Sequence, residues 1–222
     1  MDAMCASYGL DPRIGDYKSL VQAGDEVAIE SLREWAKKNA NEVLRPTGKN
    51  LRNLNPIIRG EREVEFAWWG FLIGGEPSKF PSINTRSERL KEKPGNANNR
   101  ALVPATSWLE LQKPSRDWYS FGTGDVFAMA AVTQSGKPTG GDWLTCYSIV
   151  MQPAREDLVE LHDRMPLLIP ESFYDDWLDP AHQGDAGLID AALAASQEIV
   201  AKVTASRVQP SQSPPTPGTL KA

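Results

Sequence analysis

Short apolar runs separated by turn residues constrain the fold of this 222-residue chain more than any other feature. Runs of this kind, bounded by glycine, proline and serine, are typical of β-strands. Because no regular helix separates one run from the next, an α+β domain is favoured over a doubly wound parallel sheet. The strand-like segments are residues 56–60, 63–73, 100–111, 125–133 and 143–151.

Helical patterns lie on both sides of these strands. Between residues 23 and 39, apolar residues recur at positions 28, 32, 35 and 36, and two lysines follow at the end, which predicts an amphipathic helix packed on the core. Residues 155–166 begin with the pattern of a helical turn and end at a proline. Two further helices are predicted over residues 171–179 and 186–204.

The end of the chain has a different composition. The last 17 residues contain four prolines, three serines and no aromatic residue, which is typical of a disordered segment. We therefore expect a single folded domain over residues 4–204 and a disordered Pro/Ser-rich tail over residues 205–222.

Composition excludes several classes of protein. The net charge of −5 gives no global basic signature, and no run approaches the 18 apolar residues of a membrane span. The two cysteines and two histidines are scattered without the spacing of metal ligands, so we expect no metal and no cofactor. The absence of a signal-like start and the few cysteines indicate a reducing cytoplasm.

Charge is nevertheless uneven along the chain. Residues 79–117 contain eight basic and four acidic residues, a local excess of +4. A solvated loop face and a phosphate-binding surface explain this excess equally well.

Four short stretches place polar residues in apolar surroundings, and each offers a candidate for chemistry: residues 4–7, 83–88, 104–111 and 160–166. In the first, Cys5 becomes a 1,2-aminothiol if it is the N-terminal residue of the working protein. In the second, Asn84 and Arg86 share a face if the segment is extended, although a loop with an Asx turn is the alternative.

The other two stretches offer groups for proton transfer. Glu110 alternates with Trp108 along a strand, which puts both on one face; that face either lines a pocket or meets solvent at an edge strand. His162 lies among charged residues before a proline, and a lone histidine is either structural or a general acid or base. Cys146 lies in an apolar strand and is interpreted as a small core residue.

Together these stretches resemble one family, the SRAP domain proteins (SOS response-associated peptidase), which shield abasic sites in single-stranded DNA. The resemblance runs from Met4 to about Asp179. Its motifs are Met4-Cys5, Asn84-Thr85-Arg86-Ser87-Glu88, Val103-Pro104-Ala105 with Glu110, and His162-Asp163-Arg164-Met165-Pro166, with Trp69-Gly70 and Arg45-Pro46-Thr47 as lesser marks.

The resemblance implies a mixed, largely antiparallel, barrel-like curved sheet flanked by helices. It also implies a DNA-damage response protein that links Cys5 covalently to an abasic site through a thiazolidine, with AP-lyase and self-processing activity. The implied catalytic residues are Cys5, Asn84, Glu110 and His162, and the implied DNA-binding residues are Arg86, Arg164, Trp69 and Pro46. We expect a monomer that is cytoplasmic and associated with the nucleoid when bound to DNA.

Two other functions remain open from the residues alone. One is a cysteine peptidase that uses Cys5, His162 and Asn84, and the other is a noncovalent single-stranded DNA binder. The crosslink requires a free α-amine on Cys5. We therefore expect the working protein to begin at Cys5, either because translation starts at Met4 or because residues 1–4 are removed.

Overall fold

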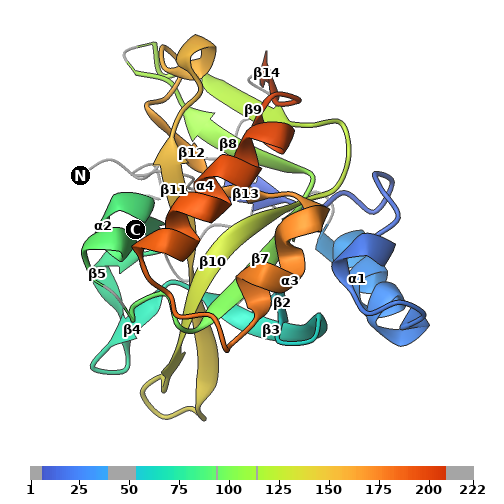
Figure 1. The fold of residues 1–222 in the computed structure, drawn as a ribbon, viewed down its shortest axis with the longest axis vertical. Helices are drawn as coiled ribbons and strands as arrows, with labels where there is room; N and C mark the ends of the chain where they lie inside the picture. Colours follow the sequence, from blue (N-terminus) through green and yellow to red (C-terminus); the bar gives the residue numbers. More distant parts are fainter. Residues whose placement is uncertain (1–6, 40–53, 94, 114, 209–222) are drawn as a thin grey trace, which may run out of the picture.

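A closed barrel forms the centre of the molecule. The computed structural model describes residues 7–39, 54–93, 95–113 and 115–208. Five strands form the ring, and β11 closes it by pairing with both β3 and β10 (Figure 1). Every pairing in the ring is antiparallel except that of β3 with β11, so the predicted mixed, largely antiparallel, barrel-like sheet is confirmed. These strands are β2 (Leu54–Arg59), β3 (Glu63–Trp69), β7 (Arg100–Ala105), β10 (Phe127–Gly136) and β11 (Leu144–Pro153).

Both faces of the barrel strands are buried, which explains why they appear in the sequence as continuous apolar runs. Along β10, Phe127, Met129 and Ala131 belong to one hydrophobic cluster, whereas Ala128, Ala130 and Val132 belong to the other. The first cluster fills the barrel, and the second lies between the barrel and its helices. This alternation follows directly from the two-residue period of a strand.

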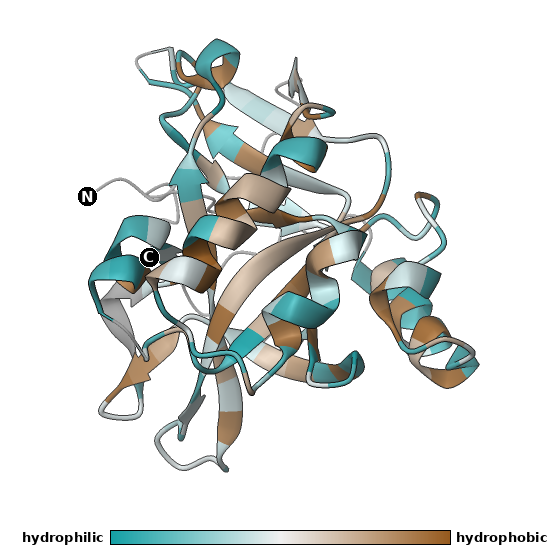
Figure 2. Ribbon diagram, viewed as in Figure 1, coloured by the Kyte–Doolittle hydropathy of each residue, from teal (hydrophilic) through white to brown (hydrophobic). Residues whose placement is uncertain are grey.

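In the described ranges, four helices flank the barrel: α1 (Glu26–Asn39), α2 (Ser87–Glu92), α3 (Tyr174–Leu178) and α4 (Ala186–Val200). α1 begins where Asp25 accepts a hydrogen bond from the Ala28 amide, and α4 begins where Asp185 caps Leu188. α4 packs against β13 and α2, and Figure 1 shows it at the front of the molecule. In Figure 2, β10 is mainly brown and white, whereas the helices around it also carry teal residues.

A second sheet of four strands lies at one end of the molecule, opposite the β10–β11 hairpin (Figure 1). Its order is β1 (Ser7–Gly9), β8 (Ser107–Leu111), β9 (Trp118–Gly122) and β14 (Thr204–Arg207). The predicted strand over residues 100–111 is therefore two strands, β7 in the barrel and β8 in the second sheet. The predicted last helix was too long, and the predicted tail began too early, because residues 204–207 pair with β9.

Shorter elements complete the fold. β4 (Phe71–Ile73) and β5 (Glu76–Ser82) form a hairpin, and β6 (Asn84–Arg86), β12 (Arg164–Pro166) and β13 (Leu168–Ile169) extend the barrel sheet. Single turns of 3-10 helix cover Lys18–Leu20, Glu156–Leu158 and Glu171–Phe173. In the described part of the chain, no helix has the length and apolar character needed to span a membrane.

Arg100 shows that local charge excess does not predict exposure. The side chain is 5% exposed, and its guanidinium donates to the carbonyl oxygens of Ala97, Trp177, Asp179 and His182. Burial lowers its pKa, yet an arginine remains charged under all ordinary conditions. Arg100 therefore satisfies the backbone carbonyls where α3 ends and is not available to a phosphate.

Replacing Arg100 tests this structural role. Arg100→Ala leaves buried carbonyl groups without their donor, so the free energy of unfolding is expected to fall by about 3 kcal/mol or more. The measurement is urea unfolding followed by circular dichroism. Arg89→Ala on the exposed side of α2 is the matched control and changes the free energy by about 0.5 kcal/mol or less. Equal effects of the two substitutions would contradict the role.

Candidate active site

Strand β11 brings two of the polar motifs together. Its second half pairs with β6 on one side, where Met151 lies opposite Arg86, and with β12 on the other, where Pro153 lies opposite Arg164. Since neighbouring strands lie about 4.8 Å apart, β6 and β12 are about 10 Å apart across β11. Segments that are far apart in the sequence therefore flank one strand end.

Strand β8 supplies the candidate carboxylate. Along Ser107–Leu111, Trp108 and Glu110 are buried, while the alternate residues of the strand are partly exposed. The prediction that these two side chains share a face is therefore confirmed, and the face is the inner one. Trp108 stacks on Phe121 at 5.2 Å, so an aromatic wall lies next to the Glu110 carboxylate, whose side chain is only 2% exposed.

His162 approaches the buried carboxylate. Its Nε2 lies 3.8 Å from Oε2 of Glu110, and its side chain is 11% exposed. Its Nδ1 lies 3.1 Å from both the backbone nitrogen and the carbonyl oxygen of Arg164, so the Arg164 backbone orients the ring with Nε2 toward Glu110. The separation exceeds a direct hydrogen bond, so a substrate oxygen can take part between the two groups.

An ion pair ties the two flanking motifs to each other. Nη1 of Arg164, on β12, lies 2.6 Å from Oε1 of Glu88 in the first turn of α2. Burial alone would raise the pKa of Glu88, but hydrogen bonds from its backbone and from Arg164 outweigh it and hold the pKa below its ordinary value. Arg164, predicted to contact phosphate, therefore already has an anionic partner.

The other predicted residues of these motifs occupy different environments. Asn84 begins β6 opposite Ile149 and is partly buried, while Arg86 ends the strand with an exposed side chain. The intervening Thr85 shares a hydrogen bond of 2.8 Å with Ser148 on β11. Arg86 is thus presented at the surface beside the Glu88–Arg164 pair.

Trp69 occupies a place that the sequence did not indicate. Its side chain is 4% exposed, and its Nε1 donates to the carbonyl oxygen of Ile83 at 2.9 Å. The indole also packs edge-on against Tyr8 at 5.0 Å and is stacked with Tyr147 at 6.3 Å. Base stacking needs an exposed ring face, so this position makes Trp69 a core residue, and the expectation that it contacts DNA is corrected.

Sequence reasoning missed a polar network in the barrel. Tyr8 and Tyr147 share a hydrogen bond of 2.6 Å between their hydroxyl oxygens, and Nδ2 of Asn55 donates to the Tyr147 hydroxyl at 3.0 Å. The only signal in the sequence was the position of Tyr8, three residues after Cys5.

Two predicted site residues, Cys5 and Pro46, lie outside the described residues. Cys146, by contrast, is fully buried in β11, and burial raises the pKa of its thiol, in agreement with its interpretation as a core residue. Within the described ranges, no group of three or more histidine, cysteine, aspartate or glutamate side chains is placed to hold a metal ion.

Comparison with known proteins assigns the chain to a family. Residues 4–211 match the model of the family described as SOS response associated peptidase (SRAP). The chain belongs to the SRAP family. In this SRAP chain, two motifs that are far apart in the sequence lie close together, since β6 and β12 pair with opposite sides of β11.

Curated relatives include the abasic site processing proteins YoqW and YobE of Bacillus subtilis, each 28% identical over 127 residues. The matches cover 50% of this SRAP chain and 55% and 57% of the relatives, so the chain spans little more than half their length. Solved structures with the same fold include a protein from Bacteroides thetaiotaomicron (TM-score 0.66, 18% identity, 93% of each chain). A phage-related protein from Bordetella bronchiseptica has a TM-score of 0.58 at 18% identity, with 92% of this chain and 93% of that chain covered.

The Glu88–Arg164 ion pair predicts a pH dependence. A carboxyl whose pKa is lowered on folding contributes stability above its unfolded pKa and loses that contribution as pH falls. Wild-type protein is thus expected to exceed Glu88→Gln in free energy of unfolding at pH 7, and the difference is expected to shrink below the ordinary carboxyl pKa of about 4.3. Urea unfolding at several pH values measures it. Glu92→Gln, on the same helix, is the control, and a difference that grows on acidification would contradict the assignment.

Proposed function

We propose that this chain processes abasic sites in single-stranded DNA and captures them covalently through Cys5. The observation that carries the proposal is the approach of His162 to the buried Glu110, 3.8 Å apart, beside the strand that begins two residues after Cys5. Membership of the SRAP family supports the proposal, as do the names of the Bacillus subtilis relatives.

Chain connectivity brings the nucleophile within reach of these groups. Ser7, the first residue of β1, pairs with Leu109, the neighbour of Glu110. Two residues of extended chain span at most about 7 Å, which limits how far Cys5 can lie from Ser7. Leu109 and Glu110 are consecutive residues of β8, so the reach of Cys5 includes the surroundings of the carboxylate.

The reaction needs an amine, a thiol and proton transfer. The ring-opened sugar of an abasic site carries an aldehyde, and an N-terminal amine with an ordinary pKa of about 7.7 to 8.0 is partly neutral at cellular pH. Attack forms a carbon–nitrogen bond, and loss of water gives an imine. The Cys5 thiol then adds to the imine carbon, its proton passes to the nitrogen, and a five-membered thiazolidine closes without any oxidant.

Glu110 and His162 have distinct proton-transfer roles in this scheme. Glu110, buried beside Trp108, exchanges protons with the carbinolamine as water leaves and with the sugar as its ring opens. His162, whose Nε2 faces Glu110, acts on the sugar hydroxyl or on the leaving group. Proton abstraction from the imine would also permit β-elimination, which would give the protein a weak AP-lyase activity.

The remaining motif residues would bind the DNA and orient the nucleophile. Arg86 is exposed and contacts a phosphate directly, whereas Arg164 contacts one while also held by Glu88. Asn84 positions the N-terminal cysteine, and Pro46, outside the described residues, lies against a base beside the lesion. The phosphate contacts do not distinguish one DNA sequence from another, and they weaken as the salt concentration rises. A monomer suffices, and its DNA substrate associates it with the nucleoid.

The free amine of Cys5 requires self-processing or initiation at Met4. A cysteine peptidase acting through Cys5, His162 and Asn84 is the second candidate, favoured by the name of the family. That peptidase would cleave peptides in trans. A covalent sensor would cleave only its own chain, ahead of Cys5.

The capture reaction is tested by electrophoresis of protein incubated with single-stranded DNA that contains one abasic site. Wild-type protein is expected to form an adduct that survives denaturation, and Cys5→Ala is expected to form none. Cys146→Ala, which removes the buried cysteine of β11, is the matched control and retains the adduct. An undiminished adduct in Cys5→Ala would reject the mechanism, and salt-sensitive retardation without an adduct would indicate a noncovalent binder.

The role of Glu110 is tested by the rate of adduct formation. Glu110→Gln keeps the shape of the side chain but removes its proton exchange, so the rate is expected to fall about 100-fold or more. Glu76→Gln changes an exposed glutamate on β5 in the same way and is expected to leave the rate within about twofold. Time courses at saturating DNA give both rates. An unchanged rate in Glu110→Gln would remove Glu110 from the reaction.

A further inference from the structure

We propose that Tyr8 is a positioning residue, whose hydrogen bond to Tyr147 fixes strand β1 and thereby holds Cys5 near Glu110 and His162. The inference rests on the proposed function, because it concerns the placement of the nucleophile in that reaction. It assigns a role to the buried tyrosine pair that the capture chemistry itself does not use.

Strand β1 is weakly held by its own backbone. It contains only three residues, and among the described strands it lies at the edge of its sheet, paired with β8. Short edge strands have few ladder hydrogen bonds and are prone to local opening. Backbone pairing alone is therefore a poor way to hold the segment that leads to Cys5.

The Tyr8 side chain holds β1 in place in addition to the backbone pairing with β8. It extends from β1 into the hydrophobic cluster that fills the barrel, where it is 1% exposed and contacts the edge of Trp69 at 5.0 Å. Its hydroxyl oxygen lies 2.6 Å from that of Tyr147, which is itself fully buried on β11. One side chain thus connects the second sheet to the strand that closes the barrel.

A buried amide fixes the partner of Tyr8. Asn55, on β2 and 2% exposed, donates from Nδ2 to the Tyr147 hydroxyl at 3.0 Å. Because that hydroxyl accepts a hydrogen bond from Asn55, it remains able to donate its own proton to Tyr8. Three strands, β1, β2 and β11, therefore meet in one chain of hydrogen bonds inside an apolar interior, where such bonds are strong.

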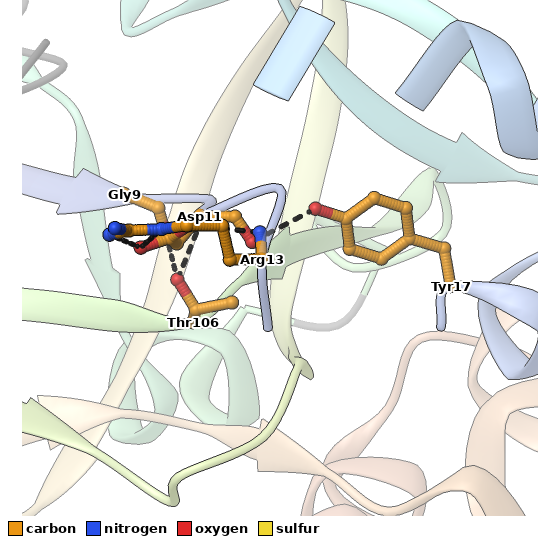
Figure 3. A network of polar contacts seen from close by, with 5 residues as sticks. All are labelled: Gly9, Asp11, Arg13, Tyr17 and Thr106. Carbon is orange, nitrogen blue, oxygen red and sulfur yellow. Dashed lines mark hydrogen bonds and ion pairs between the residues drawn. The ribbon is translucent and has the colours of Figure 1, made fainter. Parts of the chain in front are cut away.

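A separate network anchors the other end of β1, as Figure 3 shows. The Thr106 amide donates to the carbonyl oxygen of Gly9 at 2.8 Å, and its hydroxyl accepts the Asp11 amide at 2.9 Å. The Asp11 carbonyl also accepts the Tyr17 hydroxyl. This network lies after β1, on the side away from Cys5, so loss of the Tyr8 hydrogen bond would leave β1 tethered there and would allow its N-terminal end, still paired with β8 through Ser7, to swing further.

Such a swing would slow the reaction without weakening DNA binding. Covalent attack needs the reacting atoms about 3 to 3.5 Å apart, and a misplacement of about 1 Å can cost about 100-fold in rate. The proposed phosphate contacts, Arg86 and Arg164, lie on β6 and β12 and do not depend on β1. The effect is therefore expected in the maximal rate of adduct formation and not in the DNA concentration that gives half of it.

The experiment measures adduct formation by full-length wild-type protein, Tyr8→Phe, Tyr147→Phe and the double variant across a range of abasic single-stranded DNA concentrations. The maximal rate is expected to fall about 10-fold or more in each single variant, with the half-saturating concentration within about twofold. The double variant is expected to be no slower than Tyr147→Phe, because Tyr147→Phe already removes the shared hydrogen bond as well as the one from Asn55. Tyr174→Phe, in the other hydrophobic cluster, is the matched control and retains the wild-type rate.

Each other outcome rejects a defined claim. If wild-type protein forms no adduct, the proposed function fails and this inference fails with it. If wild-type protein forms the adduct and Tyr8→Phe keeps the rate of Tyr174→Phe, only the positioning role is rejected. A rise in the half-saturating concentration that accounts for the loss would also reject it. Should Tyr8→Phe not fold, Tyr147→Phe alone decides, since it removes the same hydrogen bond and leaves Tyr8 in place.

Discussion

Strand β11 and its pairing with four other strands hold this structure together. Its first half pairs with β10 and, in parallel, with β3, which closes the barrel; its second half pairs with β6 and β12. A single strand therefore closes the barrel and also fixes the positions of the β6 and β12 motifs, which lie on its two sides. Burial of both faces of β11 stabilises these pairings, since a register slip of one residue would exchange its interior and exterior side chains.

The candidate site uses this framework to keep reactive groups in defined positions. Glu110 is a carboxylate in an apolar wall, which is costly to bury and is typical of groups that exchange protons with a substrate. His162 is oriented by the Arg164 backbone, and the Arg164 side chain is oriented by Glu88. The site is thus connected to α2 and β12 through one series of contacts, while the proposed nucleophile, Cys5, precedes β1 in the chain.

Much of the fold could be predicted from the sequence because both faces of the barrel strands are buried and α1 is amphipathic. The shared face of Trp108 and Glu110 followed from strand alternation and is confirmed. β1, β6, β12 and β14 could not be predicted, because strands of three or four residues depend on their partners and carry too little pattern of their own. The expected tail included residues 205–207 for the same reason.

Individual side chains at the site were harder to predict than the strands. The family resemblance implied a DNA contact for Trp69, and the basic segment that includes Arg100 left a phosphate-binding surface open. The Trp69 indole is instead buried in the barrel, and the Arg100 guanidinium binds backbone carbonyls at the end of α3. Sequence shows which residue types are present but not the direction in which they point. Only the closed barrel reveals that Tyr8 and Tyr147, 139 positions apart, share a hydrogen bond.

The most direct test of the account is the mass of the tryptic peptide that remains attached to DNA after reaction with an abasic site. Capture by Cys5 would leave the DNA remnant on the peptide of residues 5–13, with Cys5 as its first residue, and borohydride would leave the mass of that peptide unchanged because the thiazolidine contains no imine. A remnant on a lysine-containing peptide, or on a peptide that still begins at Met1, would contradict covalent capture by the N-terminal cysteine.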